Sequence, residues 1–223
     1  MRYFIFSDTH VGAKGVNCAE VYSVFKNMKD DDVVIMAGDW VEGWTKNYKD
    51  VFIKYPKLLQ LMLRRMKHYV SGNHDSFMKW LSYMKIDTSC VQIYYPYAIL
   101  EVDDKKWYIE HGHLCGRYGK LFKFLDRFDK TKIFNYIVMW IVKLPCLSMA
   151  NKSYKVKSDM KEDAVRRGLE HGADIVIVGH DHLPAVEKID GVWLIDPGTA
   201  INNFTYVIYE NGKFRLMKSD DIL

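Results

Sequence analysis

The sequence lacks the features that would place the protein in a membrane or in an oxidising compartment. Its four cysteines stand alone at positions 18, 90, 115 and 146, without a CxxC pair. This spacing argues against a disulfide framework and against a zinc finger. No apolar run reaches the roughly 20 residues of a membrane span. The chain starts with MRYFIFSDTH and not with the longer apolar stretch of a signal peptide, so we expect a cytoplasmic protein.

Repeats and low-complexity tracts are also lacking, and short β-rich runs recur instead. They lie at 3–6, 33–36, 68–70, 107–110, 174–178, 192–195 and 205–209. Stretches with helical spacing, at about 18–28, 50–66 and 159–171, alternate with several of them. The last stretch begins with a capping pair, Asp159 and Glu162, and stops at Gly172. The alternation predicts one α/β domain over residues 1–223, with the last two runs in a more antiparallel part of the sheet.

Residues 120–147 depart from this alternation. Their apolar positions follow helical spacing, and IFNYIVMWIVKLPCL is apolar almost all round. Residues 117–157 hold ten basic and two acidic residues, a local charge of +8 in a chain whose net charge is +4. We interpret about 117–157 as a helical cap insertion with a partner of its own. The alternative is a helical hairpin that simply packs on the domain.

Nearly all of the early strand runs end in side chains that can bind a metal ion. In an open α/β sheet, ligands bind beyond the carboxyl ends of the strands, so these groups should converge. Seven nitrogen and oxygen ligands are too many for one zinc ion. A mixture of carboxylate, amide and imidazole groups suits a dinuclear site for Mn²⁺, with Fe or Zn²⁺ as alternatives. The candidate ligands are Asp8, His10, Asp39, Asn73, His111, His180 and His182.

The ordered blocks DxH, GDxxE, GNHD, HGH and GHDH resemble the calcineurin-like metallophosphoesterases, from Asp8 to about Thr199 without the insertion. The resemblance implies a four-layer α/β fold, in which two packed mixed β-sheets are flanked by helices. It also implies two metal subsites that share one carboxylate. The expected ligands are Asp8, His10 and His182 for one cation, Asn73, His111 and His180 for the other, and Asp39 as the bridge.

The chemistry that the resemblance implies is hydrolysis of a phosphoester or a pyrophosphate. Two cations would lower the pKa of a bridging water, and the resulting hydroxide would attack phosphorus in line. His74 would lie over the phosphoryl group, stabilise its charge and protonate the leaving alkoxide, while Asp75 would orient His74. Cys115 is interpreted as packing, His113 as a neighbour of the metals or of the substrate, and Asp196 as structural support for the site.

Within the family, GDWVEGW and the basic, apolar insertion after HGHLC are similar to the UDP-2,3-diacylglucosamine hydrolases. Those enzymes cleave the pyrophosphate of a nucleotide-linked lipid, and their insertion forms a cap that holds acyl chains. The resemblance makes Arg117, Asn151 and Lys152 candidate substrate-binding residues. It also suggests peripheral contact of the cap with the inner face of the membrane.

The sequence differs from that subgroup at two positions, and it is also compatible with two other functions. That subgroup usually carries Arg where this chain has His74, and Asp where it has His113. The basic cap also fits a nucleotide or nucleic-acid phosphodiesterase or phosphatase. A third possibility is a scaffold of the same fold that binds partners without catalysis, although such scaffolds tend to lose ligands and this chain keeps every expected one.

Overall fold

The computed structural model describes residues 1–43, 45–75, 91–116, 119 and 154–218, with side chains from Asp159 onwards in the last range. Most of the expected cap therefore lies outside the described residues, as do Arg117, Asn151 and Lys152. Among the described residues, no helix has the length and apolar character needed to cross a membrane.

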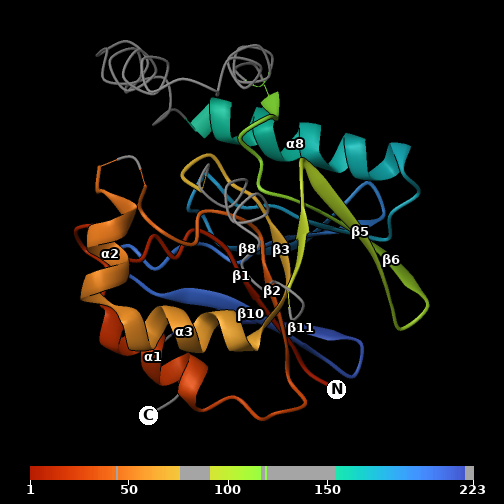
Figure 1. The fold of residues 1–223 in the computed structure, drawn as a ribbon. Coiled ribbons are helices and arrows are strands. Elements are labelled where there is room, and N and C mark those ends of the chain that lie inside the picture. Colours follow the sequence, from red (N-terminus) through yellow and green to blue (C-terminus); the bar gives the residue numbers. More distant parts are fainter. Residues whose placement is uncertain (44, 76–90, 117–118, 120–153, 219–223) are drawn as a thin grey trace.

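Two sheets form the centre of the fold (Figure 1). The first has six strands in the order β11-β10-β1-β2-β3-β4, and the second has five in the order β5-β6-β7-β9-β8. The strands of the first sheet are β1 (Tyr3–Phe6), β2 (Val33–Met36), β3 (Met66–Val70), β4 (Gln92–Tyr94), β10 (Thr205–Glu210) and β11 (Lys213–Lys218). Those of the second are β5 (Tyr97–Val102), β6 (Lys105–Glu110), β7 (Ile175–Ile177), β8 (Ala185–Ile189) and β9 (Val192–Asp196).

Helices cover the outer faces of both sheets, which confirms the predicted four-layer α/β fold. Helices α1 (Cys18–Lys26), α2 (Tyr48–Lys54) and α3 (Pro56–Arg65) lie beside the first sheet, and α8 (Tyr154–Glu170) lies beside the second. Apolar side chains such as Ile5, Ile35 and Ile177 fill the space between the sheets. A separate apolar cluster packs α8 against β7 and β9.

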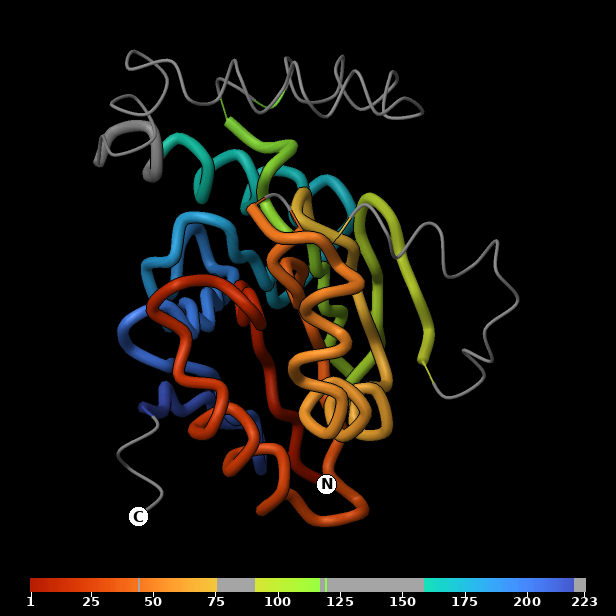
Figure 2. The backbone as a smooth tube through the Cα atoms, turned by 60° about the vertical axis from the view of Figure 1, so that its left-hand side comes forward, coloured from red at the N-terminus to blue at the C-terminus, as the bar shows by residue number. Residues whose placement is uncertain are grey.

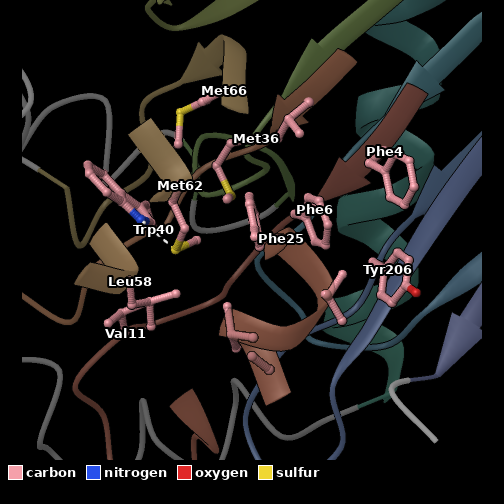
Figure 3. Close-up of a cluster of buried hydrophobic side chains, with 14 of the residues drawn as sticks. Phe4, Phe6, Val11, Phe25, Met36, Trp40, Leu58, Met62, Met66 and Tyr206 are labelled. Atoms are coloured by element: carbon pink, nitrogen blue, oxygen red, sulfur yellow. Dashed lines mark hydrogen bonds between the residues drawn. The ribbon is translucent and has the colours of Figure 1, made fainter. Parts of the chain in front are cut away.

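The core under α1 and α3 is rich in aromatic rings and methionines (Figure 3). Phe6 stacks on Phe25 of α1, with 4.7 Å between the ring centroids. Trp40 is fully buried, and its indole Nε1 donates a hydrogen bond of 3.2 Å to Sδ of Met62 on α3. Because Trp40 directly follows the candidate ligand Asp39, this packing anchors the loop that carries the ligand.

Two helix boundaries differ from the prediction. The stretch at 50–66 is two helices, since Pro56 disfavours a helical conformation at Tyr55 and begins α3 as its first residue. The capping role of Asp159 is wrong, because α8 already begins at Tyr154 and contains Asp159. Residues 154–158 include neither proline nor glycine, so nothing in the sequence stops the helix there. Its end is as predicted, with Gly172 at a φ of +69° just after the helix.

The assignment of the last two runs to one antiparallel region is also wrong. β9 belongs to the second sheet, where it pairs in parallel with β7 and antiparallel with β8. β10 belongs to the first sheet and pairs antiparallel with β1. Both runs are strands, as predicted. The prediction missed their antiparallel neighbours, β8 beside β9 and β11 beside β10, and therefore did not recognise that β9 and β10 belong to different sheets.

Candidate metal centre

All five loops that carry the candidate ligands leave the carboxyl ends of strands. β1, β2 and β3 are parallel neighbours in the first sheet, and β6 and β7 are parallel neighbours in the second. β1 runs from the end of the molecule where the N-terminus lies toward the end that α8 covers (Figure 2). The site therefore forms where the strands of both sheets end, at the end of the molecule where α8 lies.

Backbone hydrogen bonds join these loops to one another. Asp8 N donates to Gly38 O at 3.0 Å, and His10 N donates to Asp39 O at 2.9 Å. Across the two sheets, His180 N donates to the Asp8 carboxylate at 2.8 Å. The ligand loops thus hold each other in place through contacts within the protein.

Five of the candidate ligands have a positive φ although none of them is glycine. The values are 49° at Asp8, 40° at His10, 53° at Asp39, 76° at His180 and 61° at His182. Such conformations cost about 1–3 kcal/mol each and persist only where the surrounding structure enforces them. Their concentration at one place marks a site whose geometry is held against local strain.

Two glycines of the sequence blocks are required by close approach. A Cβ atom on Gly72 would overlap Oδ1 of Asp39, and one on Gly179 would overlap Ser7 Oγ beside the Asp8 carboxylate. The glycines that precede Asn73 and His180 therefore leave the space that the two carboxylates occupy. This is the physical reason for glycine in the GN and GH pairs.

The first cluster of ligand atoms contains Asp8, His10 and His182. Nε2 of His182 lies 3.1 Å from Oδ1 of Asp8 and 3.4 Å from Nε2 of His10. Asp8 is fully buried, yet its Oδ1 has no well-formed hydrogen bond from the described residues. A buried carboxylate oxygen that faces two imidazole nitrogens fits a divalent cation, so the residues present suit the expected group.

The second cluster contains Asp39, His111 and His180. Nε2 of His111 lies 3.1 Å from Oδ2 of Asp39 and 3.1 Å from Oδ1 of Asn73. Nδ1 of His111 donates to Ala37 O at 2.8 Å, which fixes the ring with Nε2 toward the site. In each cluster the candidate ligand atoms lie within 4.8 Å of one another.

Asp39 lies between the two clusters. Its Oδ2 is 3.1 Å from Nε2 of His111 in the second cluster and 3.7 Å from Nε2 of His10 in the first. Its Oδ1 accepts a hydrogen bond of 2.8 Å from His74 N. The structure thus places the seven candidate ligands together, with the expected bridging carboxylate in the middle.

His74 adjoins this centre, and the carboxylate that orients it is not the expected one. Nδ1 of His74 lies 3.2 Å from Glu42, and Nε2 lies 3.9 Å from Oδ2 of Asp39. Asp75 instead accepts hydrogen bonds from the backbone N–H groups of Trp40, at 3.0 Å, and Val41, at 3.1 Å. Asp75 therefore supports the loop after Asp39, and the predicted contact between Asp75 and the His74 ring is corrected to one from Glu42.

Sequence reasoning missed Glu42 as a functional residue, although it is the last residue of the GDxxE block. It is buried, and its carboxylate lies 3.3 Å from Nδ1 of His10 as well as 3.2 Å from Nδ1 of His74. One carboxylate therefore holds both rings by Nδ1 and leaves Nε2 of each toward Asp39. The structure also groups His74 with His10 and Asp39 as a third set of candidate ligand atoms.

Opposite charges in the centre shift the pKa values of several of its side chains. Burial opposes ionisation of Asp39, but His111, His74 and His10 keep the pKa of that carboxyl far below its ordinary value. Burial also opposes the charged form of His111, yet Asp39 and Asp8 raise its pKa to about 9. Burial and the nearby charge of His111 lower the pKa of His180 to about 3. At neutral pH, His180 is therefore a neutral imidazole, the form that binds a cation.

We expect metal affinity to rise with pH up to about 9. At pH values below the His111 pKa of about 9, the imidazole nitrogen that faces Asp39 carries a proton. A cation must displace this proton in order to bind there. One displaced proton weakens the apparent affinity by about tenfold for each pH unit below that pKa. Calorimetric titration with Mn²⁺ in buffers of different ionisation enthalpy measures both the affinity and the protons released. An affinity that stays constant with pH would contradict this prediction.

Three other residues that the sequence singled out, His113, Cys115 and Asp196, are buried. The ring of His113 is buried at a centroid distance of 5.4 Å from His111. Cys115 is buried in the core under α8, its thiol donates to Glu110 at 3.0 Å, and burial raises its pKa, which fits packing. Asp196 is fully buried on β9 and lies 3.1 Å from Nζ of Lys161.

Comparisons with solved structures show the same fold in several proteins. The chain is similar to an archaeal phosphodiesterase at 20% identity, with a TM-score of 0.51, over 98% of this chain and 99% of that chain. It is similar to the E. coli phosphoesterase Yfce at 17% identity and a TM-score of 0.55, over 99% and 94% of the two chains. Vps29 from Entamoeba histolytica, in complex with zinc, shares 12% identity at a TM-score of 0.50, over 98% of each chain.

The superfamily of the chain is identified by a family model that covers most of its length. No match was found among curated proteins. The model of the calcineurin-like phosphoesterase superfamily domain matches residues 1–211. This range includes all seven candidate ligands and every strand of the two sheets except β11. The chain therefore belongs to the calcineurin-like phosphoesterase superfamily and is a metal-dependent phosphoesterase.

Proposed function

We propose that the protein uses two Mn²⁺ ions to hydrolyse the pyrophosphate of a nucleotide-linked lipid such as UDP-2,3-diacylglucosamine. Asp8, His10 and His182 would hold one ion, Asn73, His111 and His180 the other, and Asp39 both. The observation that carries the dinuclear assignment is the position of Asp39 Oδ2, 3.1 Å from His111 and 3.7 Å from His10.

The cations, when bound, would supply Lewis-acid activation of water and of the phosphoryl oxygens. The protein would supply orientation and a proton. Glu42 holds Nδ1 of His74, so that Nε2 faces the side of Asp39 where a phosphoryl group would bind. From that position His74 can donate a hydrogen bond to a phosphoryl oxygen or a proton to the leaving oxygen. Its side chain is 17% exposed, which leaves it accessible to a substrate.

Support for a lipid substrate comes from the sequence of the insertion and from where its two ends lie. The loop after His111 reaches Gly116, whose N–H donates to Asp163 of α8 at 3.0 Å. The chain thus enters the insertion five residues after the candidate ligand His111 and returns from it into α8, which begins at Tyr154. A substrate held by this basic and apolar segment would have its phosphates close to the ions. We also propose peripheral contact between this segment and an anionic membrane surface.

Removing residues 120–147 and joining the ends with a short glycine linker tests the lipid assignment. We expect the variant to keep both Mn²⁺ ions and to hydrolyse bis-p-nitrophenyl phosphate at a rate comparable to the parent. Against a diacyl nucleotide it should lose most of its kcat/KM through KM, because each buried methylene of an acyl chain contributes about 0.8 kcal/mol.

Single substitutions make the test milder. Trp140→Glu and Ile137→Glu should raise KM for the diacyl nucleotide and leave the soluble ester unaffected. Leu169→Glu is the matched control, because Leu169 is 45% exposed on α8. Equal losses with lipid and soluble substrates would identify the segment as packing and rule out the lipid assignment.

A second candidate is a nucleic-acid phosphodiesterase, which the charge of +8 over residues 117–157 favours. In that case, neutral substitutions of Lys123, Arg127 and Lys130 should dominate over the apolar ones. Binding should then fall steeply with salt, since each phosphate contact releases counterions. Steady-state kinetics on single-stranded oligonucleotides and on the diacyl nucleotide, each at two salt concentrations, separates the two candidates.

A further inference from the structure

A buried ion-pair network links α8 to two loops of the metal centre. Nζ of Lys161 on α8 lies 3.1 Å from Oδ2 of Asp196 and 3.4 Å from Oδ2 of Asp181. It also donates a hydrogen bond of 2.8 Å to Leu183 O. The side chains of Asp196 and Asp181 are only 0% and 3% exposed, and that of Lys161 is 13% exposed. A lysine so well covered, and with three oxygen partners, is not an ordinary surface residue.

The two carboxylates divide their oxygens between their own loops and Lys161. Oδ1 of Asp181 accepts from Leu183 N at 2.8 Å, and Oδ1 of Asp196 accepts from Gly198 N at 2.8 Å. In both residues the other oxygen faces the ammonium group. Burial lowers the pKa of Lys161, but Asp196 and Asp181 outweigh it and raise the pKa above its ordinary value. The ammonium group is therefore charged and lies between two buried carboxyl groups. Burial and the nearby Asp181 raise the pKa of Asp196, and the charge of Lys161 opposes that rise.

Each of the two loops also reaches a candidate ligand. Asp181 stands between His180 and His182 in the chain. The loop after Asp196 reaches Asp8, since Thr199 Oγ1 donates to Asp8 O at 2.9 Å and Ala200 N donates to the same oxygen at 3.1 Å. Lys161 thus contacts both of the loops that set the positions of His182 and Asp8. Nε2 of His182 and Oδ1 of Asp8 lie 3.1 Å apart.

We propose that Lys161 is a positioning residue of the metal centre. Its ammonium group fixes the loops around Asp181 and Asp196, and through them sets His182 and Asp8 at the spacing that one cation requires. The expected effect of Lys161 on metal binding rests on the proposed dinuclear centre. Its expected effect on the position of the loop around Asp181 does not. Loss of a partner that orients metal ligands typically costs about 10–100-fold in metal affinity.

The test compares Lys161→Met, which keeps the length of the side chain and removes the charge, with Arg166→Met on the same helix. Arg166 is the matched control because its side chain is 61% exposed and pairs with Asp163 and Glu170 at the surface. Lys161→Arg is the conservative variant. Each full-length protein is stripped of metal with a chelator, and hydrogen exchange is followed in the peptide that contains residues 178–184. The proteins are then titrated with Mn²⁺.

In Lys161→Met we expect the amide hydrogens of residues 181–183 to exchange faster than in the parent. We also expect this variant to bind at least one Mn²⁺ about 10–100-fold more weakly. Lys161→Arg should recover part of both losses, and Arg166→Met should match the parent. If the buried carboxylates prevent Lys161→Met from folding, Lys161→Met combined with Asp196→Asn removes one of them and should still show the faster exchange and the weaker binding.

Exchange and Mn²⁺ affinity equal to those of Arg166→Met in a folded Lys161 variant would overturn the proposal. A parent protein that binds no Mn²⁺ would instead refute the proposed metal centre. In that case, the exchange of residues 181–183 would still decide whether Lys161 positions the loop.

Discussion

Replacing Asp39 by asparagine should empty both metal subsites and reduce phosphoesterase activity to background. Oδ2 of Asp39 is the oxygen that faces both clusters, at 3.1 Å from His111 and 3.7 Å from His10. The amide keeps the shape of the side chain but removes a negative charge that two divalent cations would share. Mass spectrometry of the metal content and steady-state hydrolysis of bis-p-nitrophenyl phosphate measure the two effects.

The expected contrast lies between a shared ligand and an unshared one. His182→Ala should empty mainly the subsite of Asp8 and His10, because His182 lies 3.1 Å from Asp8 and belongs to that cluster alone. Asp104→Asn, on the turn between β5 and β6, is the control and should retain both ions. Two tightly bound ions in Asp39→Asn would refute the assignment of Asp39 as the bridge.

His74→Ala should keep both metal ions and lose roughly 10²–10⁴ in kcat, the usual range for a positioned proton donor. Glu42 holds Nδ1 of His74 at 3.2 Å, so the ring is oriented by a group of the protein that is not among the seven candidate ligands. The loss should be smaller for p-nitrophenyl esters than for alkyl esters, because a good leaving group needs little protonation. Measurement of kcat for both ester types, with a metal count on the same samples, tests the role.

Two other results would assign His74 differently. An equal loss for both ester types would leave only stabilisation of charge on the phosphoryl oxygens. Loss of one metal ion would make His74 a ligand, a role for which its position next to His10 and Asp39 also qualifies it.

The strands that carry ligands were predictable from the sequence, and the four edge strands were not. The runs before Asp8, Asp39, Asn73, His111 and His180 end in buried and mostly apolar residues. The bounds of β1 and β2 match the prediction residue for residue. The strands missed were β4, β5, β8 and β11, which are the edges of the two sheets. Edge strands carry charged and polar residues that discourage further pairing, as in KFRLMK of β11, so they lack a continuous apolar signal.

The candidate ligands were predictable for a related reason. Side chains that follow parallel strands must meet at one edge of the sheets, so the sequence alone brings Asp8 and Asp39 together. The side chains that orient the ligands come from elsewhere. Lys161 lies on a helix that carries no ligand, and its contact with Asp181 depends on how α8 packs against β7 and β9. No local pattern encodes such a contact.

The measurement that tests the dinuclear centre most directly is anomalous diffraction from crystals grown with Mn²⁺. We expect two manganese peaks roughly 3.5–4 Å apart. One should lie between Asp8, His10 and His182, the other between Asn73, His111 and His180, and Asp39 should contact both. A single peak, or peaks away from these seven residues, would contradict the account.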